Sequence, residues 1–162
     1  MNNHGLLHPL TVVTALGCGL IAGVLFAFSS FVMKALGRLH PAHAIAAMQV
    51  INIAAISPAF MLALFGTGLA CVALAGLAVA HQHESYAVYQ LSGSALYLVG
   101  VIGVTMAYHV PRNNALARVR PSAIDAPRAW ARYRMQWTVA NHVRAAAALA
   151  AAASLTLALQ TV

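Results

Sequence analysis

The chain has 162 residues, of which 62% are hydrophobic and 7% are charged, against roughly 45–50% and 25% in an ordinary soluble domain. This composition leaves too little polar surface to cover a water-soluble globule, so it predicts an integral membrane protein. The length allows about four spans of ~20 residues with short connections. Residues 1–162 are therefore expected to form a single transmembrane domain.

Long apolar segments in chain order predict an all-α fold. Spanning helices are expected at about 10–33, 59–80, 86–108 and 136–159. The segment from Pro41 to Ser57 is too short to cross and opens with a proline, which is favoured in a first helical turn. A short helix at the membrane interface is therefore expected between the first two spans. Pro111 is the expected stop signal after the third span, and the whole is predicted to be a four-helix bundle with up-down topology.

The distribution of basic residues predicts orientation rather than a nucleic-acid partner. A net charge of +7 could mark a nucleic-acid-binding protein if it were soluble. However, all of the nine Lys and Arg residues except Arg144 flank predicted spans. This is the positive-inside pattern, so the first and third connections are expected to face the cytoplasm and both chain ends the other side. The lipid bilayer is the expected partner, and nucleic acid is not.

Small residues are expected to let the helices pack closely, because lipid provides no hydrophobic force that brings helices together. The expected packing residues are Gly19-x-x-x-Gly23 in the first span, the glycines at 66, 68, 76, 93, 100 and 103, and the Ala-rich run of the last span. A homodimer built on a small-residue face is also predicted. Cys18 and Cys71 both lie inside apolar segments and predict no disulfide framework.

Acidic residues are too few for several kinds of chemistry. Glu84 and Asp125 are the only 2 carboxylate residues, and neither lies in a predicted span. This excludes paired-carboxylate hydrolysis and a Ser-His-Asp triad within the bundle. His81, His83 and Glu84 offer metal-ligand atoms, but ligands crowded into one short loop rarely form a site, so no metal is predicted. Chemistry in the bundle would have to use His, Arg, Asn, Tyr, Trp and Ser.

Polar residues gather toward the cytoplasmic ends of the predicted spans, where each needs a partner or a role. They are Ser29, Ser30, Gln49, Asn52, His109, Asn113, Asn114, Asn141, His142 and Arg144. At ~100° per residue, Trp137, Asn141 and Arg144 share one face of the last helix. This face is expected to point inward, because a lipid-facing charge costs at least ~2.5 kcal/mol, although Arg144 could instead snorkel to the headgroups. His142 lies on another face and either lines the side of the same cavity, caps a neighbouring helix or is a satisfied interface histidine.

Four strings resemble the anthrone oxygenase-like family of small, mostly bacterial membrane proteins. They are FAFSSFVMKAL (26–36), AAMQVIN (46–52), YHVPRNNAL (108–116) and WARYRMQWTVANHVRAAAALAAA (130–152). The matching residues are Ser29, Ser30, Asn52, Pro111, Asn113, Trp137, Asn141, His142 and Arg144. Members tend to have Pro, Asn and Leu where this chain has Lys34, His109 and Arg112, so the resemblance carries no role for His109. It implies a location in the bacterial inner membrane.

The resemblance also implies a reaction, since fungal members are associated with oxidising anthrones to anthraquinones. An anthrone loses a proton from its methylene carbon to give an enolate that reacts directly with dioxygen, so no cofactor or metal is implied. His142 or His109 would be the base, and Arg144, helped by Asn141 and Asn52, would stabilise the enolate oxygen. The residues expected to bind the flat apolar substrate are Trp137, Phe28, Phe31, Ser29, Ser30 and Asn113.

Two other classes of function remain open from the residues. In the first, His109 and His142 are the axial ligands of a b-type haem, which would make the protein a redox or quinone-linked subunit. In the second, the cavity binds or carries a small molecule without catalysis. A Soret band in the spectrum of the purified protein would indicate the haem class. Oxygen uptake with an anthrone-like substrate would distinguish an enzyme from a protein that only binds the molecule.

Overall fold

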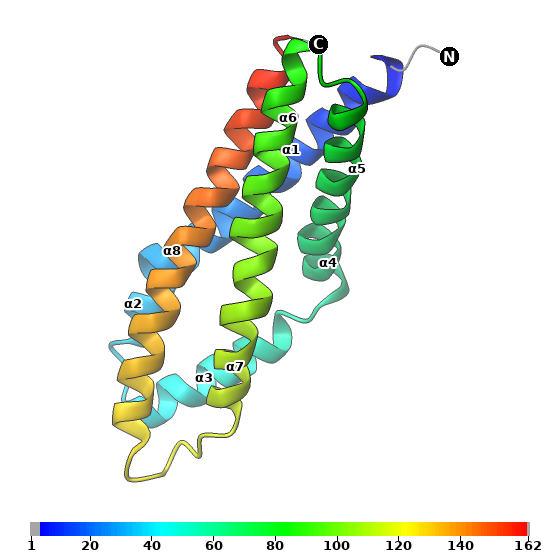
Figure 1. Ribbon diagram of the computed structural model, residues 1–162. Coiled ribbons are helices and arrows are strands. Elements are labelled where there is room, and N and C mark those ends of the chain that lie inside the picture. The colour runs from blue at the N-terminus through cyan, green and yellow to red at the C-terminus, as the bar shows by residue number, and fades with distance from the viewer. Residues whose placement is uncertain (1–3, 162) are drawn as a thin grey trace.

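The computed structural model describes residues 4–161, and all regular structure in this range is helical (Figure 1). The α-helices are α1 (His4–Ala27), α2 (Met33–Leu36), α3 (Pro41–Ala54), α4 (Pro58–Met61), α5 (Thr67–Ala80), α6 (Ser85–Tyr97), α7 (Val110–Ala117) and α8 (Ala126–Ala158). Four π-helical turns continue or join them: η1 (Phe28–Val32), η2 (Leu62–Gly66), η3 (Leu98–Gly103) and η4 (Thr105–His109). The start of α1, the turn between α5 and α6 and the end of α8 lie at one end of the molecule, and α3 crosses the other end (Figure 1).

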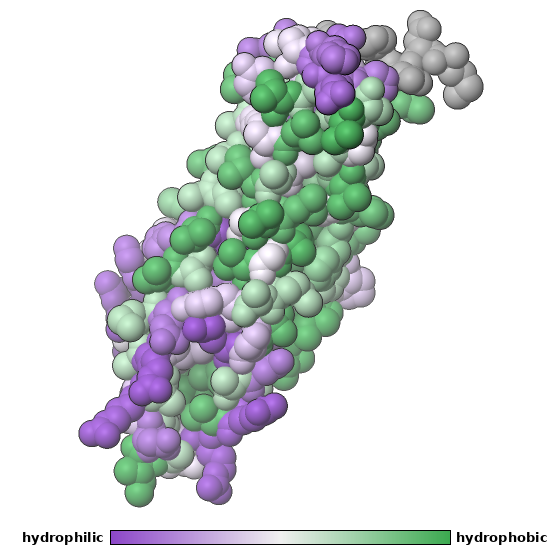
Figure 2. Space-filling model, in the orientation of Figure 1, coloured by the Kyte–Doolittle hydropathy of each residue, from purple (hydrophilic) through white to green (hydrophobic). Residues whose placement is uncertain are grey.

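Three helical stretches are long and apolar enough to cross a membrane. They are Leu6–Leu36, Pro58–Ala80 and Ser85–Ala117. Hydrophobic residues cover most of the middle of the visible surface, whereas hydrophilic residues gather at the two ends (Figure 2). This distribution is consistent with an integral membrane protein. Helix α8 packs lengthwise on α1 and α6, and its first half carries several Arg residues that lower its average hydropathy.

The third long helix passes the position where it was expected to stop. It continues beyond Pro111 through α7 to Ala117, so the prediction that Pro111 ends it is wrong. Proline disrupts an α-helix because it lacks a backbone N–H and clashes with the preceding turn. Here Pro111 lies in the first turn of α7, directly after the π-helical turn η4, where the regular α-helical bonding is already interrupted. Helix α8 begins at Ala126, so the connection between α7 and α8 spans residues 118–125.

Two apolar cores hold the helices together. The first lies among α1, α5, α6 and α8 and includes Leu25 and Leu64. The second lies where α2 and α3 pack against the start of α8, and it includes Met48 and Trp137. Residues of both cores line the same cavity, so the candidate site lies where the two cores meet.

Close helix contacts depend on some of the predicted glycines and not on others. A Cβ atom on Gly100 would lie 2.5 Å from the Cβ of Ala147, which shows that this glycine lets the third long helix approach α8. In contrast, nothing lies within 4 Å of a Cβ atom placed on Gly19 or Gly23. The expectation that Gly19 and Gly23 pack helices together within this chain is therefore wrong, because α1 turns a different face to its neighbours.

Candidate active site

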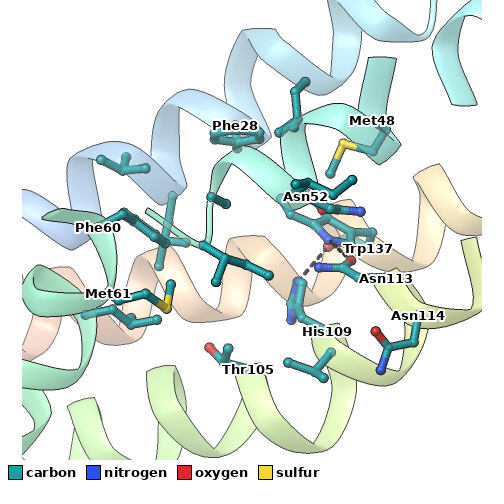
Figure 3. Close-up of a pocket in the computed structure, with 18 of the residues that line it drawn as sticks. Phe28, Met48, Asn52, Phe60, Met61, Thr105, His109, Asn113, Asn114 and Trp137 are labelled. Carbon is teal, nitrogen blue, oxygen red and sulfur yellow. Dashed lines mark hydrogen bonds between the residues drawn. The ribbon is translucent and has the colours of Figure 1, made fainter. Parts of the chain in front are cut away.

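A cavity of about 600 Å³ lies among α3, α4, α7, α8 and the end of α1 (Figure 3). This volume is within the usual range of small-molecule sites, about 300–1,000 Å³. Three π-helical turns, η1, η2 and η4, contribute lining residues, and such turns often occur at functional sites. The side chains that line the inner part include Leu25, Phe28, Met48, Asn52, Leu64, Thr105, His109, Asn113, Trp137 and Arg144.

Arg144 is a buried cation on the wall of this cavity. It is 5% exposed. Its Nη1 donates a hydrogen bond of 3.2 Å to Oδ1 of Asn141, while its Nε has no partner among residues 4–161. The chain's 2 carboxylate residues lie outside the spans, in the turn before α6 and just before α8. A guanidinium has five N–H donors, and a buried positive charge is costly unless a negative charge compensates it. Arg144 can therefore bind an anion, or stabilise an oxyanion that develops in the cavity.

Asn141 positions the Arg144 side chain. The Asn141 side chain is fully buried, and its Nδ2 donates to the carbonyl oxygen of Leu25 and to Oγ of Ser29, both at 2.7 Å. Its Oδ1 accepts the bond from Arg144. Asn141 therefore links α8 to the end of α1 and limits where the guanidinium can point.

His109 faces the cavity with two backbone acceptors beside its ring. Its Nε2 lies 3.3 Å from the carbonyl oxygen of Trp137, and its Nδ1 lies 3.5 Å from that of Val104. A neutral imidazole carries one N–H and can donate to only one of these oxygens, whereas the protonated ring can donate to both. The ring nitrogen without a hydrogen keeps a lone pair and can accept a proton.

Trp137 forms an aromatic wall that is fixed by Asn113. The indole Nε1 and the hydroxyl of Tyr133 both donate to Oδ1 of Asn113, at 3.1 and 2.8 Å. Burial raises the pKa of the Tyr133 hydroxyl above its usual range, against a smaller opposing effect of Asn52, so it donates as a neutral phenol. The ring of Phe28 lies 5.8 Å from that of Trp137 between centroids and extends the wall.

Most of the residues proposed from the sequence gather around this cavity. Those that line it are Phe28, Asn52, His109, Asn113, Trp137 and Arg144. Asn141 and Ser29 are buried behind the wall and bond to each other. Ser30 does not line the cavity, and its hydroxyl bonds weakly, at 3.4 Å, to the carbonyl oxygen of Ala27 in its own helix.

His142 and Phe31 lie away from the cavity. His142 is exposed on α8, one residue after the fully buried Asn141, and Phe31 is 62% exposed. Successive side chains of a helix point in directions about 100° apart, so a residue can point outward while a nearby residue of the same helix points inward. His109 and His142 therefore do not form facing ligands for a haem. Across residues 4–161, no group of three or more His, Cys, Asp or Glu side chains is placed to hold a metal ion.

The apolar part of the lining could not be recognised from the sequence. It is formed by Met48, Ile51, Phe60, Met61 and Leu64. Similar residues occur along every span, and these are brought to the cavity only because the chain turns between α3 and α4. The polar signal was stronger, because an asparagine, a histidine or an arginine inside a span is unusual.

The family of the chain follows from a comparison of its sequence with family models. The model described as anthrone oxygenase matches residues 59–154, more than half of the chain. The chain belongs to the anthrone oxygenase family. The matched region contains His109, Trp137 and Arg144, whereas Asn52 precedes it. No match was found among curated proteins or among solved structures.

Proposed function

We propose that the protein is a membrane enzyme that oxidises an enolisable phenolic or polycyclic aromatic compound with dioxygen. The observation that carries this proposal is the buried guanidinium of Arg144, which lies on the wall of a largely apolar cavity together with His109. Membership in the anthrone oxygenase family supports the same class of reaction.

The first step is removal of a proton from the carbon next to the substrate carbonyl. His109 accepts the proton, and the electrons of the broken C–H bond move onto the carbonyl oxygen to form an enolate. Arg144 holds this oxygen in its cavity of low dielectric constant, where a fixed positive charge stabilises the developing negative charge more than it would in water. Asn141 keeps the guanidinium in place and does not contact the substrate.

The second step is oxidation of the electron-rich carbon. The enolate gives electrons to dioxygen and forms a C–O bond, and the resulting peroxide loses water to leave a second carbonyl. The proton held by His109 returns to the outer oxygen of the peroxide. The second C–H bond of the same carbon and the O–O bond then break, and that hydrogen leaves with the outer oxygen as water, so the balance is CH₂ + O₂ → C=O + H₂O. Trp137 and Phe28 hold the flat ring system, with Asn52 and Asn113 as further polar contacts. This reaction needs no cofactor from the protein.

The proposed arrangement in the bilayer has four crossings, with α8 as the fourth. The Arg-rich connection between α7 and α8 supports a cytoplasmic position for that end, and the Ala-rich second half of α8 is apolar enough to lie beside α1 and α6 at hydrocarbon depth. The site then lies toward the cytoplasmic leaflet of the bilayer, which we propose is the bacterial inner membrane.

Replacement of Arg144 tests the reaction. We expect Arg144→Ala to lower kcat/KM for oxidation of an anthrone by roughly 10²–10³, because removal of one oxyanion-stabilising donor typically has this effect. Oxygen uptake by protein reconstituted in lipid nanodiscs measures it. Arg132→Ala is the matched control, since Arg132 is an exposed arginine on the same helix.

Full activity of Arg144→Ala would contradict the assignment of Arg144 as the residue that stabilises the enolate oxygen. Wild-type protein that binds the anthrone but consumes no oxygen would instead identify a non-catalytic binding or carrier protein. A Soret band in the purified protein would favour a haem-linked redox function.

A further inference from the structure

The cavity has a closed inner end and an open outer end. The inner end is formed by buried residues that include Leu25, Trp137 and Arg144. The outer end is rimmed by large apolar side chains that also belong to the exposed surface: Ile53, Ile56, Phe65, Met106 and Val110. Ile53 and Ile56 are 73% and 72% exposed, so they stand at the opening rather than inside it. The exposed part of the lining is therefore largely apolar, with Asn114 as its polar residue.

Two sides of the opening belong to helical stretches that are apolar enough to cross a membrane. Phe65 belongs to the stretch Pro58–Ala80, and Met106 belongs to Ser85–Ala117, both of which are apolar enough to cross a membrane. The third side is the end of α3 and the turn that follows it. Helix α3 ends at Ala54, and α4 begins at Pro58 in a new direction with Ser57 as its N-cap. Proline favours a first helical turn and disfavours an α-helical residue before it.

Hydrogen bonds join α3 to the end of the third long helix beside the cavity. Nε2 of Gln49 in α3 donates to the carbonyl oxygens of Leu116 and Val119, at 2.9 and 3.0 Å. These bonds tie α3 to the end of α7 and to the connection after it.

We propose that the substrate reaches the site sideways from the bilayer and is an aromatic ketone or phenol that carries a hydrocarbon chain. The ring lies at the closed end against Trp137 with its oxygen toward Arg144, and the chain leaves through the opening beside Ile56 and Met106 into the acyl chains. A charged or strongly polar chain would be left in hydrocarbon and is rejected. The inference rests on the proposed function for the chemistry of the ring, but binding in this orientation does not require turnover.

Photocrosslinking with a defined probe tests this orientation. The probe is an anthrone with a decyl chain that ends in a diazirine, and it is added to the wild-type protein in phosphatidylglycerol and phosphatidylethanolamine vesicles. We expect the probe to label the peptides that contain residues 53–56 and 106–110, and decylanthrone without the diazirine to compete for this labelling. Labelling spread over all lipid-facing helices, or labelling that decylanthrone does not reduce, would overturn the proposal. Equal competition by an anthrone whose chain ends in a sulfonate would overturn the rejection of polar chains.

Variants of the opening provide a second readout. Ile56→Trp should narrow the opening and lower the competable labelling of residues 106–110 by about fivefold or more, since a residue of larger volume then occupies the path. Leu69→Trp is the matched control, because Leu69 is 71% exposed on α5 and does not line the cavity. An equal loss in both variants contradicts the proposed path.

The labelling experiment separates the two proposals. Labelling at the opening without oxygen uptake would contradict the proposed oxidation and support the lateral path. Oxygen uptake with scattered labelling would end the lateral path and leave the oxidation.

Discussion

Asn141 uses its whole side chain to connect two helices and the candidate catalytic arginine. Both of its polar atoms are occupied, by Leu25, Ser29 and Arg144. In a buried setting, each partner that loses its hydrogen bond costs about 1–3 kcal/mol. A residue that does not touch the substrate can therefore affect both the stability and the activity of the protein.

We expect Asn141→Ala to lower both the thermal stability and the rate of oxidation. The stability loss should be at least about 1–3 kcal/mol, because buried groups of Leu25 and Ser29 lose their donor. Thermal unfolding in detergent and oxygen uptake measure the two effects. Ser30→Ala is the control with little effect, since Ser30 makes only a 3.4 Å bond within its own helix. Unchanged stability in Asn141→Ala would contradict the role assigned to this residue.

Tyr133 should make the stability of the protein depend on pH at alkaline values. Burial raises the pKa of its hydroxyl, so the folded protein keeps this proton where the unfolded chain, with a pKa of about 10, has lost it. The folded state then binds more protons, and its contribution to stability falls as pH rises above about 10. Below that pH, Tyr133→Phe should be less stable by about 1 kcal/mol, because the bond to Asn113 is lost.

The difference in unfolding free energy between wild type and Tyr133→Phe should therefore shrink between about pH 9 and pH 11. Chemical denaturation at a series of pH values measures it. A difference that stays constant over this range would show that Tyr133 does not titrate as its burial requires.

The two candidate histidines differ in whether their side chains face the cavity. A sequence pattern could place both at the cytoplasmic end of the bundle, but it could not choose the base between them. His109 lies on the cavity wall, whereas His142 is exposed. The exposure of His142 follows from the rotation of α8 about its own axis, which the packing of α8 on α1 and α6 sets, whereas His109 reaches the cavity wall from η4.

At the scale of the elements, helix contacts depend on a few positions without a side chain. Gly100 lies against Ala147 of α8, so even one methyl group at this position requires a backbone movement. We expect Gly100→Ala to lower stability by about 1–3 kcal/mol through overpacking. Gly19→Ala has free space around it and should be neutral or more stable by up to about 1 kcal/mol, because alanine favours a helix over glycine.

A compensating change checks that the contact itself is the cause. The double variant Gly100→Ala with Ala147→Gly moves the methyl group to the other helix and should recover most of the loss. Thermal unfolding of the wild type, Gly100→Ala, Gly19→Ala and the double variant in the same detergent measures these differences in stability. Equal effects of Gly100→Ala and Gly19→Ala would rule out close packing at Gly100.

At the scale of the whole molecule, the proposed four crossings determine which side of the membrane each connection faces. Cys18 and Cys71 are fully buried, so single cysteines introduced at exposed positions can be labelled selectively. In right-side-out vesicles, an impermeant maleimide should label Gln82→Cys and Thr161→Cys, and Ser122→Cys only after permeabilisation. Labelling of Thr161→Cys on the same side as Ser122→Cys would show that α8 does not cross.

The homodimer expected from the small-residue face stays a prediction. Gly19 and Gly23 have open space beside them within the chain, so this face of α1 makes no close contact there.

Composition and hydropathy alone determined that the protein is helical and suited to a membrane, because apolar stretches of this length cannot be covered by the few polar residues available. The cost of polar groups in lipid also indicated Asn52, Asn141 and Arg144 as residues with a partner or a role. The tertiary structure decided which histidine faces the cavity, which glycines make close contacts and where the cavity opens. These features depend on helix rotation, on the π-helical turns and on the change of direction at Pro58, and each results from packing between segments far apart in the chain.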